Sequence, residues 1–457
     1  MRAALVATLA LACGCFDPQF QPGFKCGDPN LGPACPDGFF CAADLTCQRN
    51  GTEEIPGEVF VGSAYERPAL APLDDGAVLV ARRYDPDTGR EWYELQRLSP
   101  KGALSDAQEL TTFDDEGTDP DSLVGAGNQE NAVVAGTSTS GVQVVRAGKS
   151  AVSLDHYPGL RLPAVFASTA YACVAAFNGG LSRQIAVVCT SGGPLSTTFF
   201  ELGVGRPLAG LAGAVSDQTN DPVLVWETDT DVTGKASLFV KCSNALVRDG
   251  ALATVTPPAG DRLRPQVFWS EADNVLAVAY QSFEGYNLIQ LNADCTVSGQ
   301  GTVGETGTYG YAVTGRAPTG GVTEPELWRL FLYDDVGTPV AGYGRLLPGS
   351  MITVVEGAPG GLANPAGVTD GKNQPLLLYW AANPDAGDGT GVVRGCDAMG
   401  GWGGTPLDLS RAGALPRYAV APRKAGGLFL AYSVPVGETT PHLKVRVFDE
   451  HGDPVVP

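Results

Sequence analysis

A short, strongly apolar segment recurs eight times along the chain, at intervals of about 50 residues. Each segment is built mainly of Val, Leu, Ala and aromatic residues, and most follow a turn rich in Gly, Asp or Asn. Nearly continuous apolar runs of this length suit strands that are buried on both faces. The segments are 78–80, 132–134, 173–175, 223–226, 275–278, 330–333, 376–380 and 428–432. We therefore expect one structural unit repeated many times.

The first repeat shows what surrounds each apolar segment. A strand over 67–72 precedes it, a hairpin turn at 85–89 follows it, and two more strands are expected over 92–98 and 107–113. Four antiparallel strands in about 50 residues are typical of one blade of a β-propeller. Blades of this kind occur in closed rings, because a lone blade would leave its apolar faces in water.

Composition supports an all-β chain, since its 457 residues include 60 Gly and 34 Pro but only 18% charged residues. We predict a β-propeller over 59–457 with eight blades. Seven blades are the alternative, because the unit at about 309–356 is irregular. A strand at 58–61 has no unit of its own, and the last unit lacks a clear outer strand. Pairing between these two ends would close the ring and remove its open edges.

The N-terminal residues 1–14 have the pattern of an export signal. The apolar run 3–12 has the length of a signal-peptide core and is too short to span a bilayer as a helix. It ends in Leu-Ala-Cys-Gly-Cys, which resembles the lipobox of bacterial lipoproteins, where a cysteine becomes the lipid-bearing N-terminus. Cys13 and Cys15 both fit. The resemblance implies an exported protein anchored by its lipid in the bacterial cell envelope, and we expect the outer membrane. An ordinary secretory signal is the alternative.

A small cysteine-rich module is expected over 15–50, followed by a linker over 51–58. Its cysteines are Cys26, Cys35, Cys41 and Cys47. In an exported chain they predict two disulfides, because so short a segment cannot fold on apolar burial alone. Zinc is the alternative, but the module has no Cys-x-x-Cys and no histidine. The lipobox followed by Cys-Pro-Asp-Gly-Phe-x-Cys-x5-Cys resembles the leader of many lipoproteins of myxobacteria and their relatives.

A further disulfide is predicted between Cys173 and Cys189. Both lie eight residues from Leu181, so a symmetric hairpin places them directly opposite each other on one face. For Cys242, Cys295 and Cys396, each near the end of an expected third strand, the sequence suggests no partner.

The balance of 50 acidic to 30 basic residues gives a formal charge of −20, which disfavours nucleic acid as a partner. This charge serves solubility or, alternatively, collects divalent cations. Calcium is the one cofactor that the sequence suggests, because hard cations need several convergent oxygens. The candidate ligands are Asp85 and Asp87 in one turn, and Asp114, Asp115 and Asp119 in a loop between blades. Ordinary solvated loops have the same composition.

Signatures of common enzymes are absent from the sequence, including Gly-x-Ser-x-Gly, His-Glu-x-x-His and the P-loop. His156 is placed in a loop between blades and is interpreted as an ordinary loop residue. The stretch 85–92 is a degenerate match to the Ser-x-Asp-x-Gly-x-Thr-Trp box of sialidase-type propellers, and we interpret it as a hairpin turn. The sequence therefore favours a non-catalytic binding or scaffold protein. A carbohydrate-active hydrolase or lyase and a protein-docking hub are the alternatives.

Arginine recurs where the first strand of a repeat begins, usually beside proline. The residues are Arg67, Arg161, Arg206, Arg264 and, shifted by one position, Arg417. First strands of blades line the central channel, so these side chains are expected to surround one mouth of it. Guanidinium groups bind carboxylate or sulfate with two parallel hydrogen bonds, which predicts an anionic ligand such as a glycan, or an envelope protein. Alternatively, each arginine bridges to an acidic residue of the next blade.

Overall fold

The computed structural model describes most of the chain from residue 59 onward and two short strands before it. The described ranges are 39–41, 47–49, 59–74, 76–85, 88–115, 117–119, 122–128, 130–148, 151–168, 170–178, 184–190, 196–201, 207–215, 222–228, 230–242, 250–255, 263–270, 275–283, 285–292, 295–302, 308–316, 326–335, 338–345, 353–357, 362–372, 375–383, 388–396, 402–403, 417–436, 439–453 and 455. Within some strands only the backbone is described.

The chain divides into two compact units, residues 1–54 and 55–457. In the first unit, β1 (Phe39–Cys41) pairs antiparallel with β2 (Cys47–Arg49), and Cys41 lies opposite Cys47 in the backbone register. The side chains of these two cysteines lie outside the described part of the chain. So do Cys13, Cys15, Cys26 and Cys35.

Six four-stranded antiparallel sheets follow one another within the described part of the second unit. Two of them are β7 (Val124–Gly127), β8 (Ala132–Thr137), β9 (Gly141–Ala147) and β10 (Val152–Pro158), and β11 (Leu160–Ala167), β12 (Ala172–Asn178), β13 (Gln184–Thr190) and β14 (Ser196–Glu201). The next two are β15 (Pro207–Val215), β16 (Pro222–Thr228), β17 (Ala236–Lys241) and β18 (Gly250–Val255), and β19 (Gln266–Ser270), β20 (Val275–Ser282), β21 (Gly285–Leu291) and β22 (Val297–Thr302). The last two are β23 (Thr308–Arg316), β24 (Glu326–Asp335), β25 (Thr338–Arg345) and β26 (Thr353–Gly357), and β27 (Leu362–Thr369), β28 (Pro375–Asn383), β29 (Asp388–Cys396) and β30 (Trp402–Gly403).

A seven-stranded sheet joins the beginning of this unit to its end. Its strands, in order, are β31 (Arg417–Pro422), β32 (Leu428–Val436), β33 (Thr439–Phe448), β3 (Val59–Leu73), β4 (Gly76–Tyr84), β5 (Glu91–Leu98) and β6 (Gln108–Glu109). The first residues of β3 pair with β33, where Val59 lies opposite Val445, and its later residues pair with β4, where Leu70 lies opposite Leu79. The predicted pairing of the two ends is therefore present. It is made by one continuous strand of 15 residues rather than by a separate short one.

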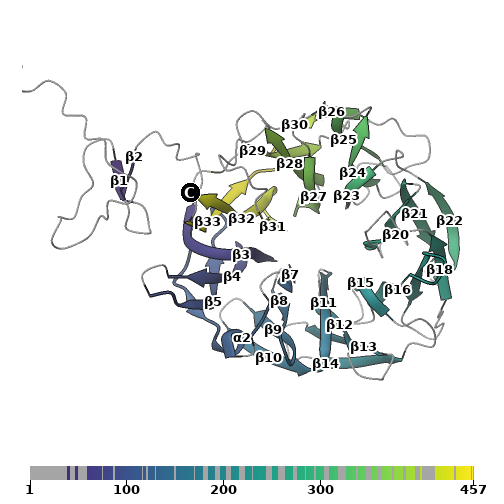
Figure 1. Cartoon of the computed structure of the whole chain (residues 1–457), viewed down its shortest axis with the longest axis horizontal. Coiled ribbons are helices and arrows are strands. Elements are labelled where there is room, and N and C mark those ends of the chain that lie inside the picture. The colour runs from purple at the N-terminus through teal and green to yellow at the C-terminus, as the bar shows by residue number, and fades with distance from the viewer. Residues whose placement is uncertain are drawn as a thin grey trace, which may run out of the picture. The chain divides into compact units, whose positions relative to one another are not determined.

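The leading strands of successive antiparallel meanders contact one another in a closed cycle. The cycle runs through β3, β7, β11, β15, β19, β23, β27 and β31 and returns to β3. Figure 1 shows these strands toward the middle of the unit, with the later strands of each sheet farther out. Consecutive four-stranded meanders whose inner strands form a ring define a β-propeller. Each of the eight apolar segments lies in the strand that directly follows one of these inner strands along the chain, as predicted.

The hydrophobic core lies between neighbouring sheets. Val80 of β4 packs in one cluster with Val134 of β8 and Val145 of β9, and all three are buried. Another cluster joins the sheet containing Val225 to the one containing Val278. Burying an aliphatic side chain of this size contributes about 1.5–3 kcal/mol relative to leaving it exposed. Burial against both neighbouring sheets explains why the second strands are apolar on both faces.

The region after β5 differs from the prediction. Instead of a strand over 107–113, the structure has the two-residue strand β6 followed by a short helix, α2 (Thr111–Asp115). Leu110 and Phe113 are both fully buried, and their spacing of three residues suits one face of a helical turn. Phe113 packs against the ring of Tyr93, with 5.6 Å between ring centroids. Among the described residues, no helix is long and apolar enough to cross a membrane.

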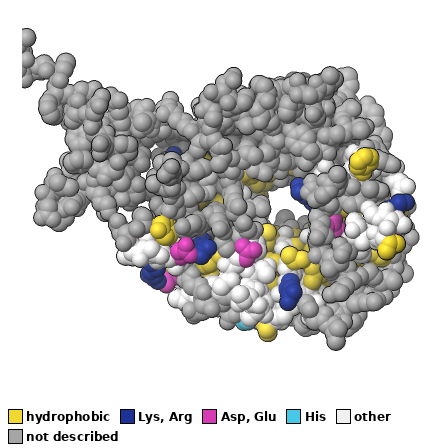
Figure 2. Space-filling model, in the orientation of Figure 1, with side chains coloured by type: hydrophobic (Ala, Val, Ile, Leu, Met, Phe, Trp, Pro, Cys, Tyr) yellow, Lys and Arg dark blue, Asp and Glu magenta, His cyan; other side chains and the backbone are white. Residues whose placement is uncertain are grey.

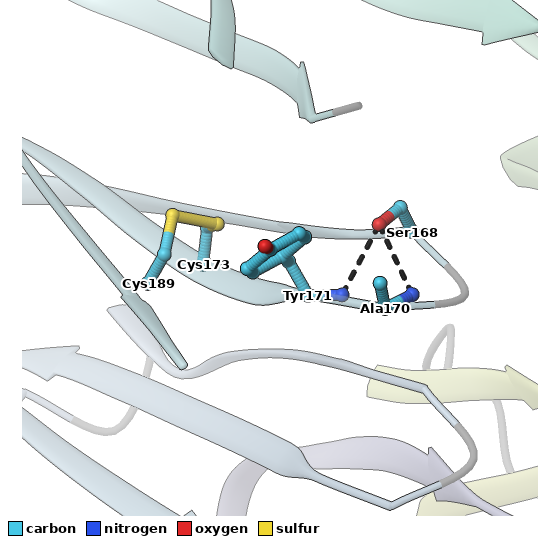
Figure 3. Close-up of a disulfide and its surroundings, with 5 residues drawn as sticks. All are labelled: Ser168, Ala170, Tyr171, Cys173 and Cys189. Atoms are coloured by element: carbon cyan, nitrogen blue, oxygen red, sulfur yellow. Dashed lines mark hydrogen bonds between the residues drawn. A yellow bond between two sulfur atoms is a disulfide. The ribbon is translucent and has the colours of Figure 1, made fainter. Parts of the chain in front are cut away.

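Two disulfides are described in the second unit. Cys173 on β12 lies directly opposite Cys189 on β13 and is bonded to it, as predicted from the hairpin symmetry. Figure 3 shows this bond close to the turn at Ser168, whose hydroxyl accepts hydrogen bonds from the backbone N–H groups of Ala170 and Tyr171. The second bond, Cys242–Cys295, has no counterpart in the predictions. It links the sheet of β15–β18 to the sheet of β19–β22.

Candidate functional site

One end of the propeller carries the segments that lead into the first strands and the turns between second and third strands. Both lie at the same end of each sheet, because successive strands run in opposite directions. Arg161 and Arg264 lie here, and both side chains are exposed. We call this end the arginine face and define it by Arg161, Leu162, Val232, Arg264 and Phe283. The side chains of Arg67, Arg206 and Arg417 lie outside the described residues.

The backbone around Arg264 is held from two sides. The carbonyl oxygen of Leu263 accepts a hydrogen bond of 2.9 Å from the N–H of Gln281, in the same sheet. The backbone N–H of Leu263 donates a hydrogen bond to Oε2 of Glu227, with 2.6 Å between the two atoms. Glu227 lies on β16 of the preceding sheet. Leu263 and Pro265 are buried, whereas Arg264 between them is exposed and has a left-handed backbone with φ of 47°. A non-glycine residue seldom adopts this conformation unless its surroundings impose it.

Arg161 follows the same local pattern with one extra residue. It comes directly after the buried Leu160, and the pairing of β11 with β12 is irregular between Arg161 and Ala164. Here the left-handed residue before proline is Leu162, with φ of 52°. Such bulges redirect side chains at the end of a strand. In both sheets, therefore, an exposed arginine follows a buried leucine and precedes a proline.

Two ion pairs that join successive meanders lie at the opposite end of the described strands. Lys372, after β27, pairs with Glu450, and Lys424, after β31, pairs with Asp74. These residues lie in turns after first or third strands, which is the end away from the arginine face. In the part of the chain that the structure describes, no carboxylate lies within ion-pair distance of Arg161.

Large apolar side chains are also exposed on the arginine face. Leu162, Val232 and Phe283 lie there, and Phe283 keeps 65% of its surface exposed. The other exposed large apolar side chain among the described residues is Val297, at the start of β22. Figure 2 shows basic and acidic side chains near a hollow in the middle of the visible face. The arginine face thus offers guanidinium groups together with apolar surface.

His156 lies in strand β10 and not in a loop between sheets, which corrects the prediction. The turn expected there is made by Gly159, with φ of 77°. The His156 ring lies 3.1 Å from the hydroxyl of Ser140, measured from Nε2 to Oγ. Asp155 is bound by Nε of Arg146 at 3.1 Å, and so does not orient the imidazole as a catalytic carboxylate would.

The predicted calcium ligands are only partly described. Oδ2 of Asp85 accepts a hydrogen bond of 2.6 Å from Thr88, and its carbonyl accepts one from Gly89, so this residue closes the hairpin turn. Asp119 is exposed, and its carbonyl accepts a hydrogen bond from the hydroxyl of Ser122. Within the described ranges, no group of three His, Cys, Asp or Glu residues is arranged to hold a metal ion. The side chains of Asp87, Asp114 and Asp115 lie outside these ranges, although Asp114 and Asp115 belong to helix α2 and not to a loop.

A scan against protein-family models finds no match for this sequence. A search of curated proteins also finds none. Among solved structures, the WD40 domain of SCAP from fission yeast is similar over 88% of this chain and 99% of its own, with 10% identity and a TM-score of 0.46. The SapL1 lectin, solved with α-methyl fucoside, matches 65% of this chain and 98% of its own, with 13% identity and a TM-score of 0.37. The six-bladed propeller lectin of Aleuria aurantia matches 63% and 92%, with 10% identity and a TM-score of 0.33.

Proposed function

We propose that this protein is an exported, lipid-anchored protein of the bacterial cell envelope that binds an anionic ligand without catalysing its conversion. The ligand would be an acidic glycan, bound through its carboxylate or sulfate groups at the arginine face. The observation that carries the proposal is the shared placement of Arg161 and Arg264, which are both exposed where a first strand begins. The site would be completed by Arg67, Arg206 and Arg417, because they occupy the corresponding position in other repeats.

We further propose that the propeller has eight blades. The six four-stranded sheets would supply six of them. The seven-stranded sheet would supply two, one of β31–β33 with the first residues of β3, and one of the remaining β3 with β4–β6. In a ring of eight equivalent blades, residues at one position of the repeat lie at one radius, which favours a shared site for the arginines.

The two disulfides support export. Cys173–Cys189 and Cys242–Cys295 are buried bonds of a kind that persists in oxidising compartments and is rare in the cytosol. Together with the lipobox-like leader, they favour a mature protein that begins at Cys13 or Cys15. Replacing both Cys13 and Cys15 by serine should release the protein from membranes and lower its mass by the lipid. Membrane attachment with unchanged mass would contradict the anchor.

Anion binding can be tested on the full-length protein in detergent. The probes are polygalacturonate for carboxylate and chondroitin sulfate for sulfate, with neutral dextran as control. We expect Arg264→Ala and Arg161→Ala each to weaken polyanion binding by about 1.5–3 kcal/mol, the usual contribution of a charged hydrogen bond. Binding should also weaken steeply with added salt. Lys101→Ala removes an exposed positive charge at the opposite end and should leave binding unchanged.

The alternative role of the arginines gives a different result. If each arginine mainly joins neighbouring blades, its alanine variant will lower the melting temperature and leave polyanion binding unchanged. That outcome would remove the proposed site.

A second candidate function is docking of an envelope protein. The observation that favours it is the exposure of Leu162, Val232 and Phe283 on the same face. Interfaces between proteins are enriched in aromatic residues and arginine. Under this alternative, Phe283→Ser would abolish recovery of a cross-linked envelope protein while leaving polyanion binding intact.

A further inference from the structure

Glu227 is a buried carboxylate that reaches from one sheet into the next. It lies at the end of β16 and keeps only 1% of its surface exposed. Its Oε2 atom accepts the N–H of Leu263, at 2.6 Å, and Leu263 directly precedes Arg264 in the following sheet. Because Gln281 holds the carbonyl oxygen of Leu263, both backbone groups of this residue are bound. The position of Leu263 is therefore set by two different sheets.

The inner strand of the preceding sheet is shaped to leave room for this carboxylate. Gly210 lies where β15 pairs irregularly with β16, and its φ is 63°. A Cβ atom at this position would lie 2.9 Å from both Cγ and Cδ of Glu227, and 3.0 Å from Cδ of Pro265. Only glycine fits here without displacing its neighbours. Three segments, at Gly210, Glu227 and Leu263–Pro265, thus fit together around one side chain.

We propose that Glu227 is a positioning residue, which holds Arg264 in the left-handed conformation that presents its guanidinium to an anion. This inference rests on the proposed function of the arginine face. Burying a carboxylate is costly unless its oxygens are hydrogen-bonded, so an apolar residue would serve better if the site only had to pack two sheets. The bond to Leu263 N–H fixes the segment directly before the left-handed residue. Without it, the segment can relax to a backbone that an L-residue prefers.

The expected effect follows from the conformational preference. For a non-glycine residue, leaving the left-handed region is favoured by roughly 5- to 30-fold, and for Arg264, which precedes Pro265, the preferred alternative is the extended region. The apparent dissociation constant rises by the factor by which the competent conformation is depopulated. Glu227→Ala should therefore weaken binding of polygalacturonate or chondroitin sulfate to the full-length protein by about 5- to 30-fold.

Asp370 provides a matched control. It is also a buried carboxylate, with 5% of its surface exposed, and its Oδ2 accepts the N–H of Gly427 in the next sheet, at 2.7 Å. This bond lies at the end of the propeller away from the arginine face. Asp370→Ala should lower the melting temperature as Glu227→Ala does, but change the dissociation constant by less than about 2-fold. Equal weakening by both variants, or none by Glu227→Ala, would overturn the proposal.

Two further variants separate positioning from folding. Glu227→Gln keeps an oxygen that can accept the Leu263 N–H, so it should restore binding to within about 2-fold of the wild type. Loss of binding in this variant, as large as in Glu227→Ala, would overturn the proposal. If Glu227→Ala does not fold, Gly210→Ala takes its place, because the added Cβ displaces the carboxylate. This variant should weaken binding over the same range, and unchanged binding would contradict the inference.

The failure of the proposed function can be told apart from the failure of this inference. If the wild type binds neither polyanion, or if Arg264→Ala binds as well as the wild type, the proposed function is wrong. The conformation of Arg264 in crystals of the Glu227→Ala variant then decides the inference. A backbone that has left the left-handed region supports the role of Glu227, whereas an unchanged φ overturns it.

Discussion

Replacing Cys242 and Cys295 by alanine should destabilise the protein more than the same change at Cys173 and Cys189. The four side chains are buried to the same degree, with 0% and 4% of their surface exposed in each pair. The losses of packing should therefore be similar in the two double variants. What differs is the length of chain that each bond closes, 53 residues for Cys242–Cys295 and 16 residues for Cys173–Cys189.

The magnitude follows from the entropy that a cross-link removes from the unfolded chain. By loop-closure entropy, the bond across 16 residues contributes about 3 kcal/mol and the bond across 53 residues about 4 kcal/mol. The difference depends only on the ratio of the two loop lengths and amounts to about 1 kcal/mol. The part of the closure entropy that does not vary with loop length cancels from this difference.

Unfolding in guanidinium chloride, followed by tryptophan fluorescence, would compare the two double variants with the wild type. The expected result is a lower free energy of unfolding for both, with the larger loss for Cys242→Ala/Cys295→Ala. Equal losses, or a larger loss at Cys173 and Cys189, would refute the loop-entropy argument. The bond between two sheets would then act mainly through local packing.

Three other changes should alter stability in defined ways. Gly427→Ala should cost about 2 kcal/mol or more in thermal melts, because Gly427 has φ of 92° and its Cβ would collide with the carbonyl oxygen of Phe448. The hydrogen bond from Lys372 lowers the pKa of the Glu450 carboxyl below its usual range. The ion pair therefore stabilises the fold at neutral pH, by less than about 1 kcal/mol because it is exposed, and this contribution is lost as the pH falls through the folded-state pKa. Comparing Glu450→Gln with the wild type by acid titration should show the difference in stability disappear at low pH; a constant difference would contradict the assignment. Deleting residues 59–63 removes the pairing of β3 with β33, so the ring should open, melt at a lower temperature and aggregate through its exposed edge, as size-exclusion chromatography would show.

The repeat could be predicted because a strand that is buried on both faces has apolar residues at every position. This pattern can be recognised without knowing which sheets lie beside the strand. Second strands such as 78–80 and 428–432 are apolar at every position, and the structure places each between two sheets. The pairing of Cys173 with Cys189 was predictable for a similar reason. Both cysteines belong to one hairpin, so symmetry about its turn sets the register.

Two features of local structure, helix α2 and the full length of strand β10, could not be recognised from the neighbouring residues in the sequence alone. Leu110 and Phe113 have the spacing of a helical turn, but five residues of helix are too few to be distinguished from a strand. Asp155, Pro158 and Gly159 are typical turn residues, and they suggested a loop around His156. In the structure the strand continues to Pro158, and only Gly159 makes the turn.

The amino-acid sequence by itself determined the recurring apolar strands, the repeat to which they belong and the recurrence of arginine near proline. Only the tertiary structure decided which sheets adjoin and which of their groups meet. Cys242 bonds to Cys295, and Glu227 binds the backbone before Arg264, across interfaces between separate sheets. The physical reason is that burial of a strand depends on the apolar character of each of its side chains, which the sequence shows directly. A contact between sheets depends instead on how the closed ring sets the spacing and rotation of each sheet against the next.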